Sequence, residues 1–123
     1  MIAYQIAKEN KILVIDEPLG IIDGYYNKVD DKKFIHVNST LPELYKKFVV
    51  AHQLYYAIND IDYKFLINKH FNADYEAKKY AMELLDVKNL LKQYGSINEL
   101  CKAFGIEDKE EIKLFKERML LSS

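Results

Sequence analysis

The clearest helix start in the sequence lies at Thr40, and it provides one long element against which the rest of the chain must pack. Thr40 precedes Glu43 by three residues, as in a capping box, and Pro42 is tolerated in a first helical turn. The helical spacing then gives an apolar stripe of Leu41, Leu44, Tyr45, Phe48 and Tyr55. We therefore expect a helix over residues 41–58, with His52 on the stripe and pointing inward.

Short strands are expected before this helix. Lys11 to Ile15 is a β-branched run that ends at Asp16, Glu17 and Pro18, whereas residues 2–9 are short for a helix. Residues 25–29 and 33–38 are apolar-rich segments joined across Asp30 and Asp31. The period of two places Phe34 and His36 on one face of the last segment. The pattern predicts a small antiparallel sheet with one side packed on a helix.

The second half of the chain has a helical pattern throughout. Asn72 can cap a helix over about residues 73–86, and Gly95 and Gly105 can end two further short helices. The expected helices are 73–86, 87–94, 97–104 and about 109–121, and the first has a stripe of Ala77, Tyr80, Ala81, Leu84 and Leu85. We predict an α+β fold, with residues 1–123 forming a single domain whose C-terminal half is helical.

The composition excludes several classes of protein. With 18 basic and 19 acidic residues the formal net charge is −1, so no global field attracts nucleic acid or anionic membrane. The one cysteine, Cys101, cannot form an internal disulfide, and Lys8, Glu9 and Lys11 interrupt any signal-peptide run. No stretch reaches the roughly 18 apolar residues of a membrane span. We expect a soluble, cytoplasmic protein.

The predicted long helix carries an incomplete metallopeptidase motif. A helical His-Glu-x-x-His places two imidazoles on one face, where both reach one zinc ion, and its Glu acts as general base. Residues 52–56 instead read His-Gln-Leu-Tyr-Tyr, so only the first histidine remains. A single histidine on an apolar helical face is more often a hydrogen-bonded core residue than a metal ligand. The motif alone does not establish a metal site.

Four segments in and around this helix form a second pattern. In order, they are Gly24-Tyr25-Tyr26, Phe34-Ile35-His36-Val37-Asn38, the segment from Phe48 to Ile58, and Asp74-Tyr75-Glu76-Ala77 continuing to Leu85. This succession resembles the ImmA/IrrE family, with its G-x-Y turn, its strand ending in Asn, its A-H-E-L-x-H-A-I helix and its E-x-E-A-x-x-F-A-x-x-L-L helix. The resemblance spans residues 11–86, with 87–121 as a helical extension.

This resemblance implies a zincin-like domain. The family's better-known members cleave or inactivate phage-type and mobile-element repressors, or act in regulating DNA-damage responses. Carried over residue by residue, His52 and Glu76, 24 positions apart, match metal ligands. Gln53 occupies the position of the general base, and Tyr56 occupies the second histidine ligand position and is a possible ligand.

Both replacements weaken the expected chemistry. An amide has no accessible protonation near neutral pH, so Gln53 cannot take a proton from water, and a loss of about 10² to 10⁴ in rate is expected. A phenol has an unperturbed pKa of about 10, and must lose its proton to bind metal well. Zinc binding is therefore expected to be weak or absent.

Three hypotheses about function remain open. The first is a pseudopeptidase that binds a repressor-like or other regulatory protein or peptide of a phage or mobile element. The second is a zinc metallo-endopeptidase acting on a repressor-like protein, present here as an inactivated variant. The third is a structural or interaction protein of a mobile element. Glu to Gln is a change an experimenter makes, but Tyr at position 56 is not an obvious second choice, which favours a natural pseudoenzyme.

Other chemically capable residues are interpreted as structural. His36 belongs to a strand face and His70 to an irregular polar stretch, while Asp60 and Asp62 flank a turn. Cys101 has the pattern of a small buried hydrophobe.

Direct binding to nucleic acid is also not expected. Residues 96–121, considered as a helix-turn-helix, contain five basic and six acidic residues, whereas a recognition helix is normally basic. The ten tyrosines are spread through the chain without basic clusters between them.

Overall fold

A computed structural model describes residues 2–61, 76–105, 113 and 117. Its elements in chain order are α1 (Ile2–Glu9), β1 (Ile12–Glu17), β2 (Gly24–Val29), β3 (Lys32–Asn38), α2 (Glu43–Ile58), α4 (Val87–Tyr94) and α5 (Ile97–Phe104). Residues 76–84 are also helical and are called helix 76–84 below. The fold is α+β, as expected, with a small sheet followed by helices.

The sheet is mixed, whereas the sequence led us to expect antiparallel pairing. Its strand order is β1-β3-β2. β2 and β3 form the expected antiparallel hairpin, but β1 runs parallel to β3 along the register from Ile12–Lys33 to Glu17–Asn38. The chain reverses direction after β1 and again after β2, so β3 runs in the same direction as β1. Because β3 lies between the other two strands, it pairs with β1 as a parallel neighbour.

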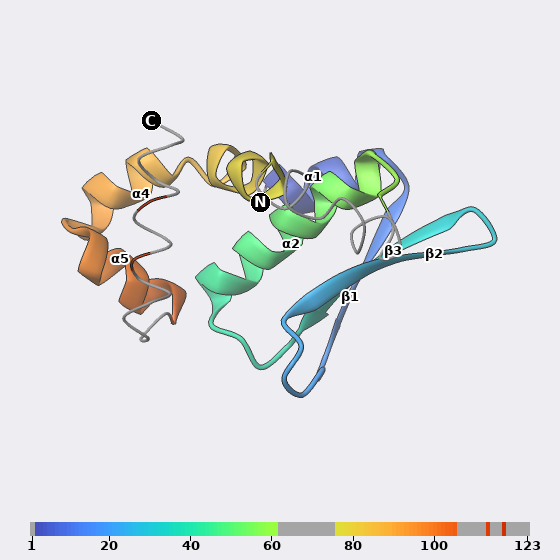
Figure 1. The fold of residues 1–123 in the computed structure, drawn as a ribbon, viewed down its shortest axis with the longest axis horizontal. Helices are drawn as coiled ribbons and strands as arrows, with labels where there is room; N and C mark the ends of the chain where they lie inside the picture. The colour runs from blue at the N-terminus through green and yellow to red at the C-terminus, as the bar shows by residue number, and fades with distance from the viewer. Residues whose placement is uncertain (1, 62–75, 106–112, 114–116, 118–123) are drawn as a thin grey trace.

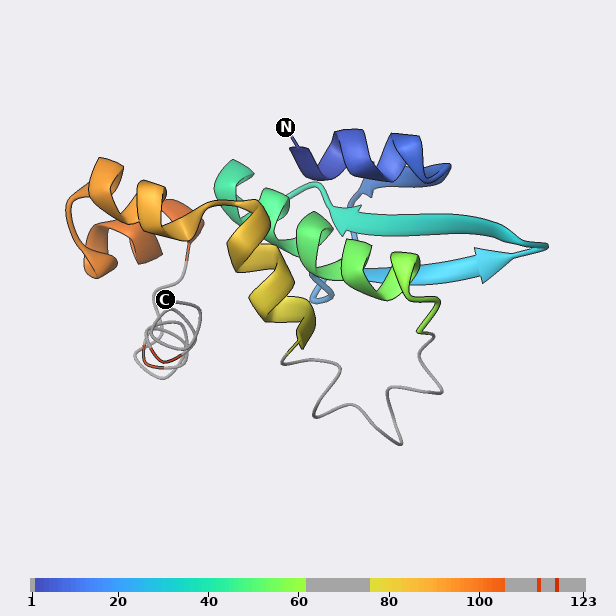
Figure 2. The ribbon, with the colours of Figure 1, turned by 90° about the horizontal axis from the view of Figure 1, so that it is seen from above.

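One face of the sheet packs against α2, as Figures 1 and 2 show. Ile35 and Val37 of β3 are fully buried, and Tyr26 of β2 is buried as well. Phe34 and His36 alternate with them and are only partly buried, which confirms the period-two prediction for this strand. Helix α2 therefore packs on buried apolar side chains at the centre of the sheet.

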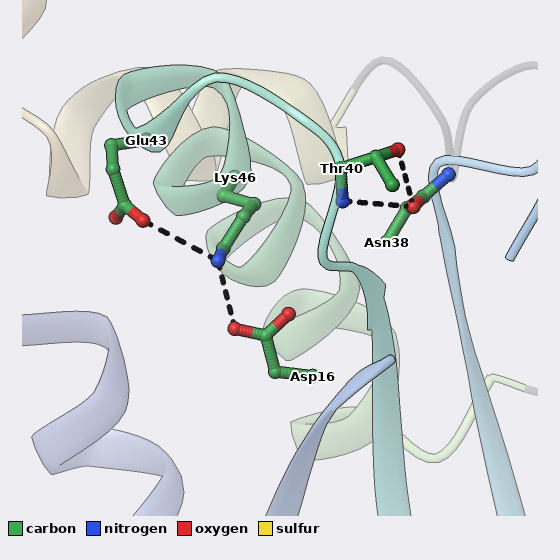
Figure 3. A network of polar contacts seen from close by, with 5 residues as sticks. All are labelled: Asp16, Asn38, Thr40, Glu43 and Lys46. Carbon is green, nitrogen blue, oxygen red and sulfur yellow. Dashed lines mark hydrogen bonds and ion pairs between the residues drawn. The ribbon is translucent and has the colours of Figure 1, made fainter. Parts of the chain in front are cut away.

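The capping-box prediction is wrong. α2 begins at Glu43 after Pro42, without a capping hydrogen bond from a side chain. The Thr40 hydroxyl instead donates to Oδ1 of Asn38 at 2.8 Å, and the Thr40 backbone N–H donates to the same oxygen at 3.1 Å, as Figure 3 shows. The Thr40 side chain is thereby engaged at the end of β3, so the helix starts later than expected.

The deepest buried face of α2 also differs from the predicted stripe. Val50, Ala51, Leu54 and Ala57 are fully buried, whereas Leu44, Tyr45 and Tyr55 are only partly buried. The difference arises because small and aliphatic residues pack against the sheet. The predicted stripe includes Phe48, which contacts Phe104 of α5. His52, which was expected to point inward with that stripe, is partly buried.

Residues 2–9 form a helix despite their short length. Ala3 and Ala7 of α1 are almost completely buried, and the helix contacts both β1 and α2. An eight-residue helix is unstable in isolation, so this packing supplies the stabilisation that its length does not.

α4 and α5 follow the expected boundaries. The helix expected over 73–86 ends at residue 84, and its predicted cap Asn72 lies outside the described residues. Asp86 and Ser96 cap α4 and α5 by accepting hydrogen bonds from backbone N–H groups, and Gly95 and Gly105 end them in the left-handed conformation. In both ribbon views α4 and α5 lie at the opposite end of the molecule from the β2–β3 hairpin, with α2 between them. The predicted helix over 109–121 falls mostly outside the described residues.

Two composition-based expectations can be compared with the described part of the chain. Cys101 is fully buried in α5, as expected of a small hydrophobe. None of the helices described here combines the length and apolarity needed to cross a bilayer.

Candidate functional site

His52 lies on α2 between two aromatic side chains of the same helix. Phe48, one turn earlier, stacks on its ring with centroids 6.2 Å apart and planes 26° apart. Tyr56, one turn later, approaches its ring with centroids 5.2 Å apart at 57°. The spacing of four residues places all three side chains on one helical face. His52 is partly buried, so its imidazole is held by packing.

Tyr56 contacts Nε2 of His52, one of the two ring nitrogens through which a histidine can bind a metal ion. Its hydroxyl oxygen lies 3.3 Å from Nε2 of His52, within hydrogen-bonding distance. The Tyr56 side chain is 3% exposed, so the hydroxyl is held in an interior environment. The phenol at the position of the family's second histidine therefore contacts the imidazole of His52 directly.

The remaining predicted site residues lie on α2 and on helix 76–84. Gln53 follows His52 and is partly buried, while Glu76 is exposed at the first described residue of helix 76–84. Tyr80, one turn after Glu76, packs against Tyr55 of α2 with ring centroids 5.8 Å apart. Burial raises the pKa of Tyr80 above its usual value. The helix that carries Glu76 thus packs on the C-terminal half of α2.

Comparison with known protein families gives a match that includes both helices of the candidate site. Residues 7–93 match the model of the peptidase M78 family, described as the IrrE N-terminal-like domain. The chain belongs to this family. The match to the IrrE N-terminal-like domain covers the sheet, α2 and helix 76–84, and it ends within α4. Helix α5 therefore lies beyond the matched residues. No curated protein and no solved structure matches the chain.

Within residues 2–61 and 76–105, the side chains do not fit the His₂Glu zinc set of this family. The described residues contain no group of three His, Cys, Asp or Glu side chains placed to hold a metal ion. His52 is the one imidazole on this face of α2, its Nε2 is within reach of a phenol, and Glu76 is exposed. Catalytic zinc sites use three protein ligands, so this donor set is short of the required chemistry.

His36, considered as an alternative ligand, takes part in a network on the sheet. Its Nδ1 lies 3.0 Å from Oε1 of Glu17, and its Nε2 lies 2.8 Å from Oδ1 of Asn27. Its ring also stacks on Tyr25 with centroids 4.3 Å apart. These contacts connect β1, β2 and β3, which gives His36 a structural role. His70 lies outside the described residues.

Asp60 also has structural partners. It follows α2 in the left-handed conformation and accepts hydrogen bonds from the Tyr26 hydroxyl at 2.9 Å and from Lys28 Nζ at 2.8 Å. The Lys28 and Tyr26 hydrogen bonds lower the pKa of the Asp60 carboxyl. The end of α2 is thus joined to β2. Asp62 lies outside the described residues.

Two positioning residues were not anticipated from the sequence. Asn38 donates through Nδ2 to the carbonyl oxygens of Gly20 and Ile22, both at 3.0 Å, and so holds the loop between β1 and β2. Lys46, on the sheet side of α2, places its Nζ 2.7 Å from Asp16 and 3.4 Å from Glu43 (Figure 3). The Asp16 hydrogen bond raises the pKa of Lys46.

Of Asn38 and Lys46, only Asn38 could have been recognised from the sequence. Asn38 ends the strand segment that carries the family resemblance, which could have marked it. The burial of Lys46 could not have been predicted from the sequence, because lysine usually occupies exposed positions.

Proposed function

We propose that this protein is a pseudopeptidase of a phage or mobile-element regulatory system, which binds a repressor-like protein or peptide without cleaving it. The proposal places this activity in the cytoplasm, in keeping with a single cysteine that cannot form an internal disulfide. Its basis is the fold of a peptidase family combined with a site that lacks the proton acceptor.

The observation that carries the proposal is Gln53 beside His52 on α2. Residues 7–93 belong to a peptidase family, and the resemblance of residues 48–58 to that family's metal-binding helix is the reason for proposing that the former chemistry lay on α2. Hydrolysis needs a group that takes a proton from the attacking water, and a carboxamide is not basic enough to do so near neutral pH. Loss of that group alone accounts for a rate decrease of about 10² to 10⁴.

The altered ligand set supports the same conclusion. Zinc binding by His52, Glu76 and Tyr56 is expected to be weak or absent, because a protonated phenol is a poor substitute for an imidazole. Without a firmly bound metal there is also no polarised water for a base to activate. A protein that keeps the peptidase fold but not the catalytic groups can still bind a protein or peptide without cleaving it.

A cleavage assay on two forms of the protein tests this function. The wild-type chain, incubated with zinc, is expected to leave unstructured casein and candidate repressor proteins intact. The variant with both Gln53→Glu and Tyr56→His is expected to bind zinc and to regain cleavage. Metal content, measured on the purified proteins, separates restored binding from restored catalysis.

The outcomes are distinct. Robust cleavage by wild-type protein free of contaminating protease would refute the pseudopeptidase proposal. A reverted variant that gains neither metal nor activity would argue against a former peptidase site on α2. The single variant Gln53→Glu serves as the matched control, since it restores the base but leaves the ligand set short.

A further inference from the structure

His52 is the centre of a series of ring contacts that joins three helices. From α5 to helix 76–84 the series, called the aromatic chain below, consists of Phe104, Phe48, His52, Tyr56, Tyr55 and Tyr80. Successive ring centroids are between 5.2 Å (His52–Tyr56) and 6.2 Å (Phe48–His52) apart. This range is typical of favourable aromatic pairs.

The two ends of the aromatic chain differ in their relation to the family segment. Phe104 is fully buried in α5, beyond the family match, and contacts Phe48 edge-on at 6.0 Å. At the other end Tyr55 contacts Tyr80 of helix 76–84, which also carries Glu76. Helix 76–84 is the element that a zinc ion would link to His52 if Glu76 and His52 shared it. The aromatic chain makes that link through side chains alone.

The hydrogen bond at the centre of the aromatic chain uses Nε2 of His52, a nitrogen that can bind a metal ion. Two donors at about 2.0–2.1 Å from one tetrahedral zinc lie roughly 3.3–3.4 Å apart, close to the 3.3 Å between Tyr56 Oη and His52 Nε2. A phenol proton donated to Nε2 and a metal ion therefore compete for the same lone pair. Because the Tyr56 side chain is buried, water competes poorly for its hydroxyl.

We propose that the Tyr56 hydroxyl donates a hydrogen bond to Nε2 of His52 within α2 and so occupies the lone pair that a metal ion would need. The contact between Tyr55 and Tyr80 then joins α2 to helix 76–84 in place of a metal ion. In this arrangement His52 is a positioning residue with its proton on Nδ1 and its Nε2 accepting. Tyr56 thus blocks the nitrogen of His52, the Tyr55–Tyr80 contact holds the two helices together, and the fold becomes independent of zinc. The inference depends on the proposed absence of firmly bound zinc, but not on what the protein binds.

Thermal unfolding with and without metal tests this inference. The Tm of the wild-type protein is expected to be the same with added zinc and with EDTA. Tyr56→Phe is expected to lower it by about 4–8 °C, the shift for one lost hydrogen bond in a small domain. Tyr56→His should instead give a Tm that rises with zinc, because metal binding to the native state stabilises it. Tyr25→Phe, which also removes a tyrosine hydroxyl, is the matched control.

Nitrogen NMR of the histidine rings provides a readout that a loss of packing would not reproduce. The Nε2 resonance of His52 is expected at the position of an unprotonated, hydrogen-bonded nitrogen and should shift in Tyr56→Phe but not in Tyr25→Phe. A wild-type Tm that depends on zinc or EDTA, or a protonated Nε2, would overturn the inference. A protein that cleaves nothing yet has a zinc-dependent Tm would sink this inference and leave the proposed function standing.

Discussion

Gly24 of β2 lies so close to Val49 of α2 that no larger residue fits between them. An added Cβ would lie 2.6 Å from Cγ1 of Val49 and 2.7 Å from the carbonyl oxygen of His36. The glycine of the family's G-x-Y turn is thus required by the close approach of sheet and helix. It sets the position of the helix that carries the candidate site.

Gly24→Ala is expected to destabilise the fold by about 1–3 kcal/mol, the usual cost of overpacking a close contact. Val49→Ala removes the methyl group nearest to the new Cβ, so the double variant should recover part of the loss. Recovery should be incomplete because the His36 carbonyl belongs to the backbone of β3. Chemical denaturation of the two single variants and the double variant measures this coupling, and strict additivity would contradict it.

Asn38 should be the most sensitive polar residue near the start of α2. Its side chain is 2% exposed, donates to two loop carbonyls and accepts from Thr40. Asn38→Asp keeps the acceptor but loses both donors, and we expect a loss of about 1–3 kcal/mol with faster proteolysis in the loop over residues 18–23. Thr40→Val removes only one hydroxyl and is the matched comparison. Equal effects of the two substitutions would contradict the assigned role of the Asn38 amide.

Acid should weaken the connection between the end of α2 and β2. The pKa of Asp60 is lowered from 3.8 by its hydrogen bonds to Lys28 and Tyr26, so its contribution to stability is present above that value. This contribution is lost as the pH falls through the lower pKa of the folded state, where the carboxyl becomes protonated.

The variant Asp60→Asn tests the acid prediction, since asparagine tolerates the left-handed backbone at this position. It should be less stable than wild type near neutral pH, and the difference should shrink as the pH falls below about 4. Denaturation midpoints across this range measure the difference. Asp31→Asn, another exposed left-handed aspartate, should show no such convergence.

Phe104 links the segment beyond the family match to the core. It is fully buried against Phe48, so Phe104→Ala is expected to cost about 3–5 kcal/mol. Tyr94→Ala, at a position 38% exposed in α4, should change stability by less than about 0.5 kcal/mol. If residues 1–123 form a single domain, both variants unfold in one cooperative transition. A separate early transition of the C-terminal helices would contradict this.

Much of the element order could be predicted because it depends on local patterns. The alternation around Phe34 and His36, the glycines after α4 and α5, and the helical stripe of Ala77 and Ala81 each reflect the geometry of a few consecutive residues. The candidate site followed from the same kind of information. His52, Gln53 and Tyr56 are neighbours on one helix, and Glu76 was named by resemblance.

Long-range packing decided what these patterns could not. The parallel pairing of β1 with β3 depends on which strand lies in the middle of the sheet, and no local pattern carries that information. The capping box failed because Thr40 is engaged by Asn38, and Lys46 can be buried because Asp16 of β1 accepts a hydrogen bond from its Nζ. In each case a distant residue supplies the stronger partner.

By itself, the sequence determined that one histidine remains on α2, that the residue beside it cannot act as a base, and that a phenol follows one turn later. Helical geometry already brings positions 52 and 56 near each other. Only the tertiary structure decided that the Tyr56 hydroxyl is buried and within reach of Nε2, and that rings from α5 and helix 76–84 extend the contact in both directions. The physical reason is that burial and ring packing depend on helices that are distant in sequence, whereas the motif depends only on its own turn of helix.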